Sequence, residues 1–131
     1  KIKYLEVLLM RAQHATECEL LVMKCIWMNP DKELSMPAIN ELVNKTYDKD
    51  WAPQTVSTFL KRLRNRGFLE AERRGRSFVY HSLIDAEEYK AATVMDCCEF
   101  WCNGDAAKML EIVKNDRGLS QEEVEKIKAL F

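Results

Sequence analysis

Glycine and proline are scarce in this chain, with four glycines and three prolines among 131 residues. A β-sandwich or barrel needs many tight turns, so this scarcity argues against both folds. Apolar residues make up 47% of the chain, which is enough for a core and argues against disorder. The N-terminal stretch KIKYLEVLLM is too short and too interrupted to be a membrane span or a secretion signal. The length fits one domain, or one domain with a smaller appendage.

Motifs of catalytic sites are also missing. The sequence has no G-x-S-x-G, no phosphate-binding loop, no zinc-peptidase motif and no adjacent cysteine–histidine pair. We therefore expect neither an enzyme nor a bound cofactor. The five cysteines are an odd number and follow no signal peptide, which is typical of free thiols in a cytoplasmic protein.

Charge is nearly balanced over the whole chain, at a net −1, but it is unevenly distributed. Residues 51–82 hold seven lysines and arginines against two glutamates, a net of +5, whereas residues 83–131 have a net of −5. A basic segment between a near-neutral and an acidic one favours nucleic acid as the partner.

The basic segment contains a helix with its own start and stop signals. Pro53 suits the first helical turn, and Gly67 suits the left-handed residue that closes a helix. Apolar side chains at helical spacing form one stripe that faces a core, namely Val56, Phe59, Leu60 and Leu63. The opposite face carries no carboxylate, and its residues are Gln54, Thr58, Lys61 and Asn65, with Thr55 and Arg62 on one flank. Such a face suits base contacts in the major groove of DNA; the alternative is a solvated surface helix.

Two earlier helices lead to this one. A capping box at residues 16–19 predicts a helix to about Met28, and Pro37 opens the next helix after an edge strand at Leu34-Ser35. Residues 44–50 are polar and are expected as a loop.

After Gly67 the apolar pattern changes to alternation, which predicts a β-hairpin over residues 68–82. Its tip carries Arg73, Arg74 and Arg76 around Gly75. Three helices followed by a basic hairpin are the pattern of a winged helix-turn-helix, an α+β arrangement within a mainly α chain.

The last part of the chain predicts three more helices, which start at Asp85, Asp105 and Ser120 and end at about Asn103, Lys114 and Phe131. This region is too small for a core of its own, yet it is rich in large apolar residues, so we expect a helical dimerisation appendage. The predicted organisation is an N-terminal extension with a helical pattern (1–15), a winged-helix DNA-binding domain (16–83) and a helical dimerisation domain (84–131).

Three stretches resemble the BlaI/MecI/CopY family of penicillinase-type transcriptional repressors. CELLVMKCIW (18–27) resembles the first helix of the family, and WAPQTVST (51–58) resembles its W-x-P-x-T-V-x-T recognition helix. RGRSFVY (74–80) resembles its wing. The resemblance implies a homodimeric repressor that binds a palindromic operator upstream of resistance genes. It also implies release by a membrane sensor that triggers cleavage in the dimerisation region. Two features depart from the family pattern. Gln54 stands where lysine or arginine is common, and the C-x-C…C-x-C motif of the copper branch is absent.

The residues predicted to contact DNA are Gln54, Thr55, Thr58, Lys61, Arg62, Arg74 and Arg76. A glutamine can pair with adenine through two hydrogen bonds, and threonine methyls can meet thymine methyls. The two wing arginines are expected at phosphates, which set register without reading sequence. The alternatives are a threonine that only caps or solvates its helix, a solvated arginine turn, and a basic face that docks an acidic protein.

Cysteines suggest one further alternative, a thiol- or metal-responsive regulator. Cys98 and Cys102 are four residues apart and share a helix face, whereas Cys97 points elsewhere. Two thiolates are too few for a closed zinc site, which takes four ligands. We therefore expect no metal, and small apolar packing at a dimer interface as the role of these residues.

Overall fold

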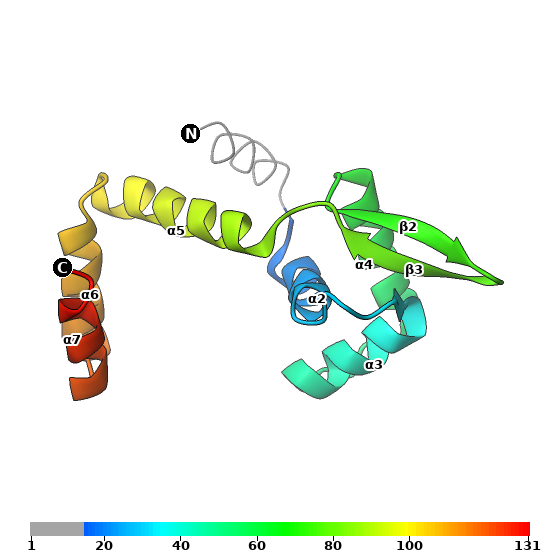
Figure 1. The fold of residues 1–131 in the computed structure, drawn as a ribbon, viewed down its shortest axis with the longest axis horizontal. Coiled ribbons are helices and arrows are strands. Elements are labelled where there is room, and N and C mark those ends of the chain that lie inside the picture. The colour runs from blue at the N-terminus through cyan, green and yellow to red at the C-terminus, as the bar shows by residue number, and fades with distance from the viewer. Residues whose placement is uncertain (1–14) are drawn as a thin grey trace. The chain divides into compact units, whose positions relative to one another are not determined.

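The computed structural model describes residues 15–131, so the predicted extension over residues 1–15 lies almost wholly outside the described part. The chain has two compact units, one that ends at Ala92 and one from Thr93 to Phe131. The described elements are, in order, α2 (Glu17–Trp27), β1 (Leu34–Ser35), α3 (Met36–Tyr47), α4 (Pro53–Asn65), β2 (Leu69–Arg74), β3 (Ser77–Ser82), α5 (Ala86–Cys102), α6 (Ala106–Asp116) and α7 (Gln121–Lys128). The predicted mainly α, winged helix-turn-helix fold is confirmed (Figure 1).

The predicted capping box starts α2. The Thr16 hydroxyl accepts a hydrogen bond from the Glu19 N–H at 3.2 Å, and Glu19 Oε1 accepts one from the Thr16 N–H at 2.8 Å. These two bonds satisfy two of the N–H groups that a helix start leaves unpaired.

The Glu19 carboxylate has a second function, because it is fully buried. Arg66, which directly follows α4, donates from Nη1 to Glu19 Oε1 at 2.7 Å. Arg62 Nη1 lies 3.9 Å from Glu19 Oε2, an oxygen that accepts no hydrogen bond from any residue between 15 and 131. A buried carboxylate is costly without such cations, so this group ties the start of α2 to the end of α4.

The turn between α3 and α4 corrects one prediction. Residues 44–47 belong to α3, which ends with Asp48 in the left-handed conformation (φ 52°), so the predicted loop starts too early. The reason is that a polar side chain of this segment, Asn44, binds the backbone of Trp51. Asn44 accepts from the Trp51 N–H at 2.9 Å, and both Asn40 and Asn44 donate to the Trp51 carbonyl at 2.9 and 3.0 Å. These amides fix the backbone of Trp51, directly before Ala52, the N-cap residue of α4, whose side chain forms no capping hydrogen bond.

The three strands form one antiparallel sheet in the order β1-β3-β2. The β2–β3 register runs from Leu69 opposite Ser82 to Arg74 opposite Ser77, which confirms the hairpin. Gly75 at its tip has φ +62°, a conformation that glycine adopts at little cost. The hairpin extends away from the helices of this unit (Figure 1). The short strand β1 confirms the predicted edge strand, because Leu34 pairs with Tyr80.

The core of the first unit lies between α2, α3, α4 and the base of the sheet. Its buried members include Val22, Met23, Ile39, Val43, Val56, Leu60, Leu63 and Phe68. The predicted α4 stripe is therefore buried, with Phe59 packed against it from a half-buried position. Tyr89 and Ala92 of α5 also belong to this core. The Trp27 indole donates to the Ile84 carbonyl at 3.0 Å, which holds the chain where it leaves the sheet.

The second unit contains the rest of α5 and the helices α6 and α7. Asp105 caps α6, and Ser120 and Glu123 form a capping box at α7. Hydrogen bonds from the Ser120 backbone and the Arg117 side chain lower the pKa of Glu123 to about 2. The last helix ends at Lys128, three residues before the predicted end. Within residues 15–131, no helix combines the length and apolar character needed to cross a membrane.

Replacing Glu19 by alanine should lower the free energy of unfolding by about 3 kcal/mol, because Arg66 loses a buried partner. Glu17→Ala is the matched control, since Glu17 is an exposed acid in the same helical turn. Both variants should be unfolded in denaturant at one fixed protein concentration. A loss in Glu19→Ala no larger than in the control would show that the buried pair does not stabilise the fold.

Candidate nucleic-acid interface

The exposed face of α4 is the centre of the candidate site. Burial of the apolar stripe turns Gln54, Thr58 and Lys61 to solvent, as predicted from their spacing, whereas Thr55 is half-buried. The Thr58 hydroxyl donates to the Gln54 carbonyl at 3.0 Å. Its proton is therefore already engaged, and the hydroxyl oxygen and the methyl group are what Thr58 can offer to a ligand.

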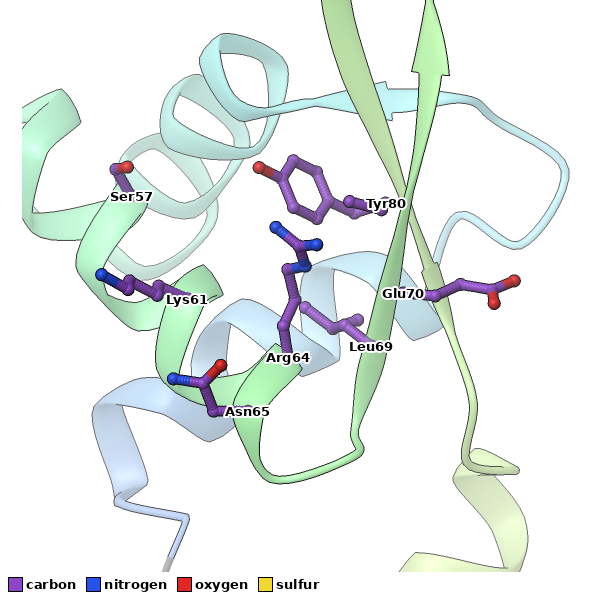
Figure 2. Close-up of a pocket in the computed structure, with 8 residues that line it drawn as sticks. Ser57, Lys61, Arg64, Asn65, Leu69, Glu70 and Tyr80 are labelled. Atoms are coloured by element: carbon purple, nitrogen blue, oxygen red, sulfur yellow. The ribbon is translucent and has the colours of Figure 1, made fainter.

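The two flanks of α4 have different surroundings. On one flank Arg62 approaches Glu19. On the other flank, α4 and the hairpin border a cavity of about 550 Å³, which is lined by Ser57, Lys61, Arg64, Asn65, Leu69, Glu70, Ala71 and Tyr80. Figure 2 shows Arg64 extending from α4 toward Tyr80 of β3. The predicted residue Lys61 thus lies beside the hairpin, and Arg62 lies beside α2.

Three residues that line the cavity, Ser57, Arg64 and Asn65, are not among the DNA contacts predicted from the sequence. At roughly 100° per residue, Ser57 and Arg64 lie about 20° apart around the helix, on the flank opposite Thr55 and Arg62. That spacing was available in the sequence. The sequence alone does not show which flank of α4 faces the hairpin, because that depends on the packing of α4 against the sheet.

The electrostatics of this flank favour an anion. In the part of the chain that the structure describes, neither Lys61 nor Arg64 forms an ion pair, and α4 contains no carboxylate. Glu70 belongs to the lining of the cavity, but its side chain extends away from Arg64 (Figure 2). Basic and hydroxyl groups so arranged can donate to phosphodiester oxygens.

At the hairpin tip, the two predicted arginines differ. Arg74 forms ion pairs with Glu33 and Glu72, and the Glu72 and Glu33 carboxylates raise the pKa of Arg74 above its usual value. Arg74 in turn lowers the pKa of Glu72. Arg76 is exposed and has no ion pair or hydrogen bond from its side chain to any residue between 15 and 131.

The cysteines do not form a recognisable site. Burial raises the pKa of Cys25 to about 11, and burial also raises the pKa of Cys98. Both thiols are therefore protonated near neutral pH, which makes them poor nucleophiles. Across residues 15–131, no group of three or more His, Cys, Asp or Glu side chains is arranged to hold a metal ion.

The chain is similar to known proteins over most of its length. The sequence model of the penicillinase repressor family matches residues 15–131. The methicillin resistance regulatory protein MecI of Staphylococcus aureus (strain N315) is 30% identical over 117 residues, which cover 88% of this chain and 91% of that protein. The penicillinase repressor of Bacillus licheniformis is 32% identical over 113 residues, which cover 86% of this chain and 84% of that protein. The solution structure of the DNA-binding domain of the repressor BlaI is 34% identical, covers 58% of this chain and 88% of that one, and has a TM-score of 0.49.

The family match extends over the whole described chain, including both α4 and the C-terminal helices. The chain belongs to the penicillinase repressor family, a family of DNA-binding transcriptional repressors and not of enzymes.

Proposed function

We propose that the chain acts as a homodimeric repressor of a resistance-type operon and binds a palindromic operator through α4 and the β2–β3 hairpin. The observation that carries this proposal is the exposed face of α4, which has no carboxylate and borders the basic cavity beside the hairpin. Regulation of resistance genes follows the named functions of two relatives, a methicillin resistance regulatory protein and a penicillinase repressor.

Gln54, Thr55 and Thr58 are the proposed base contacts. Gln54 is exposed at the N-terminal end of α4, where a helix in the major groove commonly meets base edges. Its amide can donate to and accept from one adenine, and the Thr58 methyl group can contact a thymine methyl. Each good bidentate pair discriminates by roughly 1–3 kcal/mol against the wrong base.

Phosphate contacts are proposed for the basic side chains around this face. Lys61 and Arg64 lie on the flank beside the hairpin, and Arg62 lies on the flank beside α2. The tip of the hairpin adds Arg74 and Arg76 as predicted contacts. With α4 in the major groove, cations on both flanks would meet the two sugar–phosphate strands that border the groove.

The second unit is proposed to form the dimer. Large apolar side chains are exposed in this unit, both on its helices and after α7, among them Phe100, Trp101, Leu110, Ile112, Leu130 and Phe131. Phe100 and Trp101 are each about three-quarters exposed and pack edge to face, with ring centroids 4.8 Å apart. Apolar surface of this extent on a unit of 39 residues is typical of a segment that another chain covers.

Release of the operator is proposed to follow cleavage in this dimerisation unit, triggered by a membrane sensor-protease. Support for this partner comes from family membership. A cytoplasmic location is proposed on the same ground, since a repressor must meet the chromosome. Loss of dimerisation would weaken binding, because two linked half-site contacts bind far more tightly than one.

A footprint on the promoter of the gene that encodes the chain tests the proposed function. We expect two protected half-sites related by two-fold symmetry and separated by about one helical turn of DNA or a multiple of it. Affinity should fall by orders of magnitude between about 50 and 200 mM salt. Equal affinity for the promoter and for random duplex DNA at physiological salt would contradict a repressor function, and would favour a module that docks an acidic protein.

Arg64→Ala tests the flank beside the hairpin. Removal of one phosphate contact should reduce the slope of log affinity against log salt concentration by about 0.9. Lys114→Ala is the matched control, because it removes one exposed cation from α6 in the second unit. If Arg64→Ala and Lys114→Ala gave the same salt slope as the unmodified chain, the cavity flank would not contact DNA.

A further inference from the structure

All the nitrogens of the Arg74 guanidinium are engaged. Nε donates to Glu33 Oε2 at 2.8 Å, and Nη2 lies 2.7 Å from the same oxygen. Nη1 donates to Glu72 Oε1. Glu72 is a neighbour on the same strand, but Glu33 lies 41 residues away, in the segment between α2 and β1. Arg74 therefore links the outer end of the hairpin to a separate part of the fold.

The alternation of the strands explains why Arg74 meets Glu33. Glu72 and Arg74 lie on one face of β2, opposite Val79 and Ser77 of β3. The other face of the hairpin carries Leu69, Ala71 and Tyr80, which line the cavity beside α4. Arg74 thus lies on the hairpin face directed away from α4.

Arg73 and Arg76 differ from Arg74 in their partners. Arg73 Nε donates to the Gly75 carbonyl at 3.1 Å, and its guanidinium lies over the Phe78 ring at 5.6 Å from the centroid. Arg76 lies in the turn itself and, among the residues that the structure describes, has no partner for its side chain. Of the three tip arginines, Arg76 can therefore bind a phosphate without giving up an existing interaction.

We propose that Arg74 is a positioning residue that fastens the wing to the segment before β1 through Glu33, and that Arg76 makes the wing's phosphate contact. The proposal rests on the proposed function, because it concerns DNA bound by the wing. It replaces a direct phosphate contact of Arg74 with an indirect role. If Arg74 turned to a phosphate, Glu33 would lose its ion pair with Arg74, and Glu72 would lose one of two basic neighbours, the other being His81. Carboxylates so exposed close to a polyanion are unfavourable.

The direction in which Glu33→Ala changes the affinity for DNA distinguishes the two possible roles of Arg74. If Arg74 fastens the wing, Glu33→Ala and Arg74→Ala weaken binding to the promoter fragment by similar factors, of about three- to tenfold. The double variant is then no weaker than either single one, because both changes break the same link. If Arg74 instead binds phosphate, Glu33→Ala frees it and tightens binding. Glu17→Ala is the control for loss of one negative charge.

Salt dependence supplies the second readout. Arg76→Ala should reduce the salt slope by about 0.9, as expected for one lost phosphate contact. The Glu33→Ala and Arg74→Ala variants should each keep a normal thermal unfolding transition. An unfolded chain would then not explain the weaker complex. Tighter binding by Glu33→Ala, unchanged binding by both Glu33→Ala and Arg74→Ala, or an unchanged slope in Arg76→Ala would each overturn the proposal. Failure of the unmodified chain to prefer its promoter would overturn the proposed function instead.

Discussion

The buried carboxylate of Glu19 is the constraint on which the arrangement of the winged helix depends. It completes the capping box of α2 and pairs with Arg66, 47 residues further along the chain at the end of α4, so one side chain joins these two helices. An isolated buried carboxylate would be strongly unfavourable, and relocation of either helix would leave it in that state. The penalty for misplacement thus makes the position of α4 against α2 specific, beyond what the apolar stripe supplies.

The candidate DNA-reading helix is consequently held at both ends by polar contacts. At its start, Asn40 and Asn44 of α3 bind the backbone of Trp51, and at its end Arg66 binds Glu19. Between these ends the buried Val56, Leu60 and Leu63 leave the opposite face in solvent. The backbone of a helix fixed in this way needs no further ordering on binding, which preserves affinity.

Local signals in the sequence predicted most of the fold. These signals depend only on neighbours in sequence, and the structure confirms the elements that they predict. They are the capping residues Thr16, Asp105 and Ser120, the proline at the start of α4 and the alternation of the hairpin. The segment from Asn44 to Tyr47 was wrongly expected as a loop, because its polarity serves a contact with Trp51 that lies in another segment. Composition alone does not distinguish an asparagine that solvates a loop from one that anchors a turn.

The site was predictable to a smaller extent, because its organisation depends on long-range packing. The exposure of Gln54, Thr58 and Lys61 followed from helical spacing, and their contacts with bases or phosphates stay predictions. The functions of Ser57 and Arg64 depend on which flank of α4 faces the hairpin. The partner of Arg74, Glu33, is distant in sequence and belongs to a segment without regular structure before β1. Pairings of this kind are a property of the assembled fold.

The most direct test of the central claim is a map of backbone amide chemical shifts in the isotope-labelled chain on addition of its promoter fragment. The account predicts that the largest changes occur along α4 from Gln54 to Asn65 and at Gly75 and Arg76 of the hairpin tip. An unrelated duplex at physiological salt should give much smaller changes. Changes confined to α5, α6 and α7, or equal changes with both duplexes, would contradict the claim that α4 reads the operator.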